Sequence, residues 1–159
     1  MFDVYAPLNS LPRIFGTAFE TIPAKVPYLK AEPELVSVWR DRLPPKPGWR
    51  VGLCWQGSQL NRGDRRRSIP LQEFKPCLES ADDQVITAQL DVVVTVDTAI
   101  KHLAGALGVS TFLLLKCTPD WRWLGERNDS SWCPAMRLLR QNALGSWADV
   151  IGALSSTDH

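Results

Sequence analysis

The stretch that decides the fold is Val92–Leu115, which reads VVVTVDTAIKHLAGALGVSTFLLL. Its first five residues are all β-branched, and this predicts a strand that is buried on both faces. Asp97 and Thr98 precede a helical pattern over 99–107 that Gly108 ends, and 111–116 predicts the next strand. A strand, a helix and a second strand in this order predict a parallel crossover and therefore an α/β fold.

The alternation of strands and helices continues on both sides of that stretch. Further strands are expected at Trp49–Trp55 and Met136–Leu139. Further helices are expected to begin at Pro33, at Pro70, near Asp82 and at Ser146. The sequence therefore predicts a small, mostly parallel sheet of about four strands flanked by helices, a shortened doubly wound (Rossmann-like) arrangement.

Composition limits the classes of protein to consider. The chain has 159 residues, of which 45% are hydrophobic and 22% charged, as in ordinary globular domains. A net charge of +1 argues against a generally polycationic nucleic-acid binder. No apolar run approaches the ~20 residues of a membrane span, and the first ten residues lack the features of a signal peptide. We therefore expect a cytoplasmic protein without a membrane span.

Residues 1–32 form a separate region of the sequence. Repeated prolines exclude a long helix there, yet apolar side chains recur throughout it. We expect an apolar arm that packs either on its own domain or on a domain absent from this chain. Residues 33–159 are then expected to form a single α/β domain.

The cysteines do not predict a metal site. Cys54, Cys77, Cys117 and Cys133 form no CxxC pair, and the chain has only two histidines. We expect reduced thiols, most of them buried, and no bound metal.

The first candidate site is the polar loop after the strand expected at Trp49–Trp55. In open α/β sheets, ligands bind outside the carboxyl ends of the strands. Glycine and serine permit close approach of backbone amides, and arginine donates to phosphate through paired N–H groups. The loop does not match a P-loop, and a solvated basic loop is an equally good interpretation of the local sequence. The candidate phosphate contacts in it are Gln56, Gly57, Ser58, Arg62, Arg66 and Arg67.

The second candidate site is Asp97-Thr98-Ala99 with His102, at the start of the expected helix 99–107. The N-terminus of a helix offers free amides and a partial positive charge, which suit an anion. His102 can donate a hydrogen bond to a phosphate or sugar oxygen. The alternative is that Asp97 and Thr98 only cap the helix and that His102 is a satisfied, partly buried residue.

A third stretch, Pro119–Trp132, contains three tryptophans together with Asp120 and Arg122. Such side chains can stack on a base or a sugar ring. Core packing with a cation–π contact is the more ordinary explanation.

These stretches occur together in one order, and the chain resembles the C-terminal, donor-binding domain of B-type glycosyltransferases. The nearest groups are the heptosyltransferase-like family (family nine) and the glycosyltransferase-like domains that follow tetratricopeptide repeats in bacterial proteins. The resemblance covers nearly the whole chain. It rests on Ser10–Thr17, Glu20–Ala24, Val26–Leu29, Val51–Gly57, Arg67–Leu71, Ala88–Asp91, Val96–Ala99, His102–Gly108, Pro119–Leu124, Trp132 and Met136–Gln141.

The resemblance implies that the second loop holds the diphosphate of a nucleotide sugar, through Asp97, Thr98, Ala99 and His102. The first loop would supply further phosphate contacts. It implies an inverting, metal-independent sugar transfer without a cofactor, in which arginines and the helix dipole stabilise the departing diphosphate. It does not identify catalytic residues in this chain.

Two departures from the family weaken the expectation of activity. The N-terminal domain, which carries the acceptor site and usually the general base, is absent, so we expect no catalysis by this chain alone. Only 36 residues separate Trp55 from Val92, and because a βαβ unit takes about 30 residues, the family's middle strands cannot fit.

The shortening predicts that the first strand lies at an edge of the sheet, covered by the arm 1–32 or by a second subunit in a homodimer. The alternative function is a remnant domain that acts as an interaction or assembly module without a nucleotide. RNA binding through Arg62–Arg67 is the least favoured function, because no second basic stripe accompanies that patch.

Overall fold

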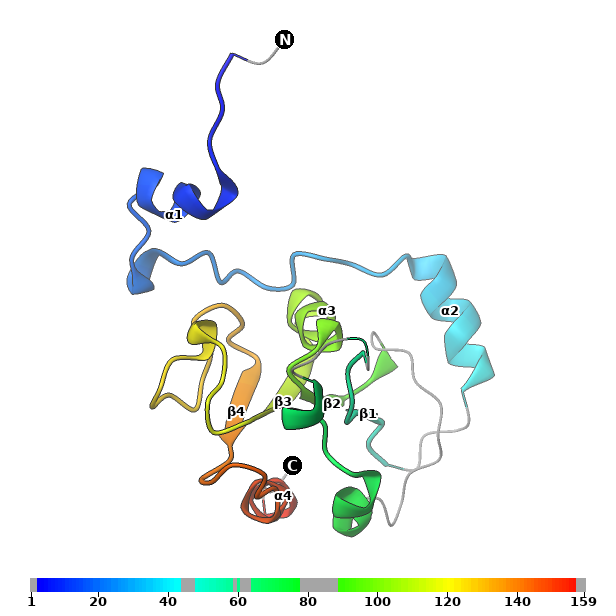
Figure 1. Ribbon diagram of the computed structural model, residues 1–159. Helices are drawn as coiled ribbons and strands as arrows, with labels where there is room; N and C mark the ends of the chain where they lie inside the picture. The colour runs from blue at the N-terminus through cyan, green and yellow to red at the C-terminus, as the bar shows by residue number, and fades with distance from the viewer. Residues whose placement is uncertain (1–2, 44–47, 59, 61–63, 78–88, 157–159) are drawn as a thin grey trace.

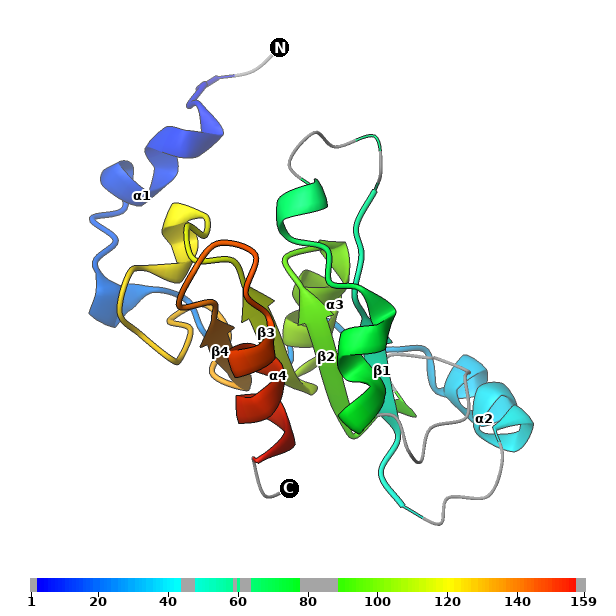
Figure 2. The same ribbon diagram turned by 60° about the horizontal axis from the view of Figure 1, so that its bottom comes forward.

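The computed structural model describes residues 3–43, 48–58, 60, 64–77 and 89–156 (Figures 1 and 2). The strands are β1 (Val51–Cys54), β2 (Val92–Val96), β3 (Ser110–Leu115) and β4 (Met136–Arg140). The α-helices are α1 (Leu11–Ile14), α2 (Pro33–Arg42), α3 (Ala99–Leu107) and α4 (Ala148–Ser155). Short 3-10 helices are η1 (Leu8–Ser10), η2 (Phe19–Thr21), η3 (Asp64–Arg66), η4 (Leu71–Cys77) and η6 (Trp121–Trp123).

The four strands form one parallel sheet in the order β1-β2-β3-β4. This confirms the predicted α/β fold with a small parallel sheet. The register pairs Val51 with Val92, and Val92 in turn with Ser110. All five residues of β2 are buried, as the unbroken β-branched sequence predicts for a strand covered on both faces.

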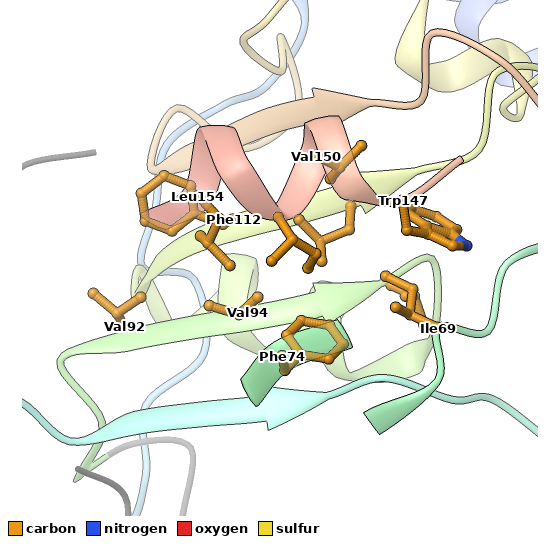
Figure 3. Close-up of a cluster of buried hydrophobic side chains, with 11 residues drawn as sticks. Ile69, Phe74, Val92, Val94, Phe112, Trp147, Val150 and Leu154 are labelled. Carbon is orange, nitrogen blue, oxygen red and sulfur yellow. The ribbon is translucent and has the colours of Figure 1, made fainter. Parts of the chain in front are cut away.

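Alternate residues of the strands face two separate apolar clusters. On one face, Phe74 of η4 and Leu154 of α4 pack over Val94 of β2 and Phe112 of β3, as Figure 3 shows. On the other face, Leu113 and Leu138 pack with side chains of the β3–β4 connection, and α3 covers this face. The second cluster consists of Leu113, Leu115, Trp123, Cys133, Met136 and Leu138.

The two connections between the first three strands lie on opposite faces of the sheet. α3, between β2 and β3, lies on one face, and η4, between β1 and β2, lies on the other. Right-handed crossovers that step in one direction across a sheet keep their helices on one face. A helix placed like η4 ordinarily leads to a strand on the far side of β1, where the described residues place none. The position of β1 at the end of the strand order fits the expected shortening.

Several predicted elements differ in detail from the observed ones. α2 begins at Pro33 as predicted, and apolar side chains along it are exposed: Leu35 by 54%, Val38 by 45% and Trp39 by 39%. The helix predicted from Pro70 is the 3-10 helix η4, because Pro76 cannot donate the hydrogen bond that a regular helix needs. Most of the helix predicted near 82–90 lies outside the described residues.

The arm contacts the main domain through α3. The amides of Tyr28 and Leu29 both donate to the carbonyl of Ala106 at 3.0 Å, and Pro27 lies against Gly108, whose φ of 73° ends α3. The sequence predicts that β1 is covered either by the arm or by a second subunit, whereas these contacts of the arm are with the C-terminal end of α3 (Figure 1). None of the residues 3–43 is buried.

The helices of the described residues are all too short or too polar to cross a membrane.

Candidate anion-binding site

The carboxyl ends of parallel strands meet at one edge of a sheet, and both predicted loops leave from that edge. The first loop follows β1, and the second joins β2 to α3 (Figure 2). The thiol of Cys54, the last residue of β1, lies 3.6 Å from the hydroxyl of Thr98. The structure therefore brings together the two loops that the sequence predicts to bind one ligand.

Asp64 organises the first loop, and sequence reasoning missed this role. Its carboxylate is buried and accepts hydrogen bonds from the Gly57 amide at 3.1 Å, Arg67 Nε at 2.9 Å and the Ser68 hydroxyl at 2.8 Å. Burial alone raises the pKa of Asp64, but the hydrogen bonds from Arg67 and Ser68 outweigh it and hold that pKa below its usual value. The signal in the sequence was a lone acid among arginines.

Arg67 connects the first loop to the second. While its Nε binds Asp64, its Nη1 donates to the backbone oxygen of Asp97 at 2.7 Å. A Cβ at residue 57 would lie 2.6 Å from Arg67 Nη2 and closer still to Asp64 Oδ1. Gly57 is therefore needed to make room for the Asp64–Arg67 pair, and two of the three guanidinium nitrogens of Arg67 donate within the protein.

Two further residues, Lys101 and Trp123, bind the side chain of Asp97. Its carboxylate forms an ion pair with Lys101, four residues along the chain, and accepts a hydrogen bond from Trp123 Nε1 at 3.2 Å. Lys101 is buried, and its ammonium lies 4.7 Å from the centre of the Trp123 ring. Asp97 thus shapes the loop, and its oxygens already have partners.

Lys101 is a buried cation among other cations. Desolvation, with the charge of Arg122 added to it, lowers the pKa of Lys101 to about 8, although Asp120 acts in the opposite direction. The same residues influence His102, whose pKa is lowered by desolvation and by the charges of Lys101 and Arg122. Basic groups therefore gather around the start of α3.

The N-terminus of α3 has no side-chain cap. Thr98 occupies the cap position in an extended conformation, but its hydroxyl lies 3.3 Å from the hydroxyl of Thr95 and does not accept from the helix. In the described part of the chain, no side chain accepts from the amides of Ala99, Ile100 or Lys101, which have no acceptor within the helix either. The alternative of a simple Asp97-Thr98 cap is therefore wrong.

The remaining predicted site residues are distributed unevenly. Ala99 is the first residue of α3, and Gln56, Ser58, Arg66 and His102 are exposed. Arg62 lies outside the described residues. Exposed donors beside an uncapped helix terminus suit a negatively charged ligand.

The third predicted stretch, Pro119–Trp132, contacts the start of α3 through Trp123. Trp123 is buried at 3% exposure, which confirms the core interpretation for that residue. Trp121 is 72% exposed, so this interpretation does not apply to it. Arg140 at the end of β4 donates to the carbonyls of Trp123 and Arg127, and this fixes the loop that carries η6.

Within 3–43, 48–58, 60, 64–77 and 89–156, no three of the His, Cys, Asp and Glu side chains are grouped so that they could hold a metal ion. Cys54, Cys117 and Cys133 are free thiols.

Fold and site together define a class: an α/β domain with a basic loop and an uncapped helix terminus at the carboxyl edge of its sheet. No protein-family model matches the sequence, and no solved structure matches it. The chain is similar to Protein FlbA of Caulobacter vibrioides, with 24% identity over 197 residues. The alignment covers 98% of this chain and 33% of FlbA, so the chain spans about a third of the length of that relative. The aligned stretch is longer than the 159 residues of this chain, which means that FlbA has additional residues within it.

Proposed function

We propose that this domain binds the diphosphate of a nucleotide sugar at the N-terminus of α3. The observation that carries the proposal is the uncapped first turn of α3, with Thr98 bonded elsewhere and no acidic residue in that turn. The partial positive charge of a helix terminus favours an anion, and phosphate oxygens are suitable acceptors for its amides. Lys101 and Arg122 add positive charge at the same place, and the lowered pKa of His102 reflects that charge together with desolvation.

The residues of the site divide into two groups under this proposal. The amides at Ala99 and beyond, the exposed guanidinium of Arg66 and the Ser58 hydroxyl would contact the phosphates. Asp64 and Asp97 would hold the two loops in place without contacting the ligand, since both carboxylates are already engaged within the protein.

The proposed role is that of the donor half of a glycosyltransferase. Transfer requires that the acceptor and a base also be held, and the resemblance assigns both to an N-terminal domain outside these 159 residues. We therefore propose binding without turnover by this chain alone, in the cytoplasm. The resemblance of the sequence motifs to those of glycosyltransferase donor domains is the argument for a nucleotide sugar as ligand, and the positive charge around α3 is the argument for its diphosphate.

Thermal unfolding with ADP, UDP, GDP and dTDP, each at two salt concentrations, tests the proposal. A ligand at 100 times its Kd adds about 2.7 kcal/mol of stability. For a chain of this size that corresponds to a rise in Tm of roughly 5–10 °C. No rise with any nucleotide, in protein that unfolds cooperatively, would refute the proposal.

A substitution at Ala99 tests the helix amides directly. Proline is tolerated at the first position of a helix and lacks the N–H group, and the extended backbone of Thr98 suits a following proline. Ala99→Pro is expected to preserve the fold and reduce the nucleotide-induced rise in Tm, whereas Ala99→Ser, which retains the amide, leaves it unchanged. Arg66→Ala is expected to reduce the rise, and Arg13→Ala in the arm is the matched control for the loss of one positive charge.

The apolar arm favours a second candidate function, an interaction module for another protein chain. Large apolar side chains that are half or more exposed recur along the arm and α2. Exposed apolar surface of this extent marks interaction sites. The side chains are those of Val4, Tyr5, Leu8, Ile14, Phe15, Phe19, Tyr28 and Leu35. A homodimer through this surface is one form of this proposal.

A further inference from the structure

Trp121 is the most exposed tryptophan of the described residues, although it lies in a well-anchored loop. Its exposed fraction is 72%, while Trp123, two residues further along the same 3-10 helix, is 3% exposed. Exposure of so large an apolar ring costs free energy, because about 25 cal/mol is lost for each Å² of apolar surface left in water. A ring held rigidly in water is therefore a candidate contact for a ligand.

The loop around Trp121 is fixed before any ligand arrives. The rings of Trp121 and Trp132 form a T-shaped contact with 6.5 Å between ring centres. Trp132 Nε1 donates to the carbonyl of Arg122 at 3.3 Å, and Asp120 Oδ1 accepts from the Arg122 amide at 3.1 Å. Because this loop is already ordered, little conformational entropy would be lost when the ring of a ligand stacks on Trp121.

η6, which carries Trp121, lies against the start of α3. Trp123 contacts both Asp97 and Lys101, and the charge of Arg122 influences Lys101 and His102. Trp121 is thus two residues along the same 3-10 helix from a side chain that contacts the start of α3. A cationic site beside an exposed, immobile indole matches a molecule that carries an anionic group and a planar ring.

We propose that Trp121 is the stacking platform for the base of a nucleoside diphosphate whose phosphates occupy the N-terminus of α3. This inference rests on the proposed function and adds where the nucleoside lies. Stacking tolerates any base, because every base has a π-face, so Trp121 would supply affinity and other contacts would select the base. Arg122, the next residue, has a side chain that is 42% exposed and pairs through Nε with Asp120 Oδ1 at 3.0 Å, so its remaining N–H groups would be the ones to pair with a phosphate.

The test compares the Kd values of nucleoside diphosphates and of inorganic pyrophosphate by titration calorimetry. Trp121→Ala is expected to weaken binding of the preferred nucleoside diphosphate by roughly 5- to 150-fold, the range for loss of one base–aromatic stack. Binding of pyrophosphate is expected to stay within about twofold, since pyrophosphate has no ring. Trp121→Phe is expected to retain most of the affinity. Trp39→Ala, which removes a tryptophan on α2 that packs on Arg42, is the matched control and is expected to change neither Kd.

Each other outcome has a definite meaning. If the Trp121→Ala variant binds the nucleoside diphosphate with the wild-type Kd while the Ala99→Pro variant no longer binds it, the stacking inference is overturned and the proposed function stands. If Trp121→Ala weakens pyrophosphate as much as the nucleoside diphosphate, Trp121 only maintains the loop and the inference is again overturned. If the wild-type protein binds pyrophosphate and no nucleotide, the site takes simple anions and both proposals are overturned.

Discussion

Arg67 and Asp97 join the two loops of the candidate site: Arg67 Nη1 donates to the backbone oxygen of Asp97 at 2.7 Å. The two residues are 30 positions apart in the sequence and lie in loops that follow different strands, β1 and β2. Because Arg67 also binds Asp64 and Asp97 also binds Lys101, one chain of charged contacts spans both loops. The loops are therefore expected to keep their relative position with or without a ligand.

Asp64→Ala should destabilise the protein. The change removes the acceptor for the Gly57 amide, the Arg67 guanidinium and the Ser68 hydroxyl, and it leaves a partly buried guanidinium unpaired. We expect a loss of about 2–4 kcal/mol in the free energy of unfolding, measured by urea denaturation. Asp3→Ala, at an exposed position, is the control and should stay within about 0.5 kcal/mol of wild type. A wild-type midpoint for Asp64→Ala would contradict the role given to this carboxylate.

Two glycine-to-alanine substitutions should change the stability of the protein in opposite directions. In Gly57→Ala the new methyl group collides with the Asp64–Arg67 pair, so stability and nucleotide binding should both fall. In Gly152→Ala, on the exposed side of α4, the methyl group meets nothing within 4 Å. Alanine is favoured over glycine in a helix by about 0.8–1.0 kcal/mol, so Gly152→Ala should raise Tm. Differential scanning calorimetry of the two variants measures both effects.

Lys101 should make stability depend on pH in the alkaline range. Its pKa is about 8 in the folded protein and 10.5 for an ordinary solvated lysine, as in the unfolded chain, so between these values the unfolded chain binds more protons. The free energy of unfolding should therefore rise with pH across this window as far as Lys101 contributes to it. The comparison is with Lys101→Met, whose free energy of unfolding lacks this contribution. A difference between the two proteins that stays constant from pH 8 to 10 would show that Lys101 does not titrate in this way.

Phe74→Ala tests whether η4 belongs to the cooperative core. Phe74 is 1% exposed and packs in the cluster that includes Val94 and Val150. Its removal should cost about 3–5 kcal/mol. Leu144→Ala, which truncates a side chain exposed by 68%, should change stability by less than about 0.5 kcal/mol. A small effect of Phe74→Ala would mean that η4 unfolds independently of the sheet.

Phe15→Ser and Phe19→Ser test the second candidate function. Both side chains are more than half exposed, so neither change should lower Tm by more than the ~1 °C that small surface effects produce. If the arm mediates self-association, the double variant should shift light-scattering mass toward the monomer. An unchanged mass at all protein concentrations would contradict a homodimer through the arm.

Local sequence patterns were sufficient for most of the fold. The β-branched run of β2, the proline that begins α2 and the glycine that ends α3 each act over a few residues, and each element formed where its signal lies. The exposure of Leu35 and Val38 on α2 could not be predicted, because an amphipathic pattern does not reveal whether a partner surface is present.

The interior of the site could not be predicted, because its contacts are distant in the sequence. Trp123 and Asp97 are 26 residues apart, and nothing local connects them. The ion pair of Asp97 with Lys101 was visible as an i, i+4 spacing, but the burial of Lys101 depends on the loop that covers it. The helix expected to begin at Ser146 is α4, which begins two residues later, at Ala148, without a side-chain cap.

Because Tyr28 and Leu29 donate hydrogen bonds to Ala106, both ends of α3 make contacts outside the helix. The N-terminus of α3 presents its amides to the candidate ligand, and the C-terminus binds the arm. At 1.5 Å per residue, the nine residues of α3 separate these ends by only about 13 Å. The surface that would meet another chain and the surface that would meet a phosphate therefore lie at opposite ends of one short helix. A displacement of α3 by a partner of the arm would move the amides of the candidate site with it.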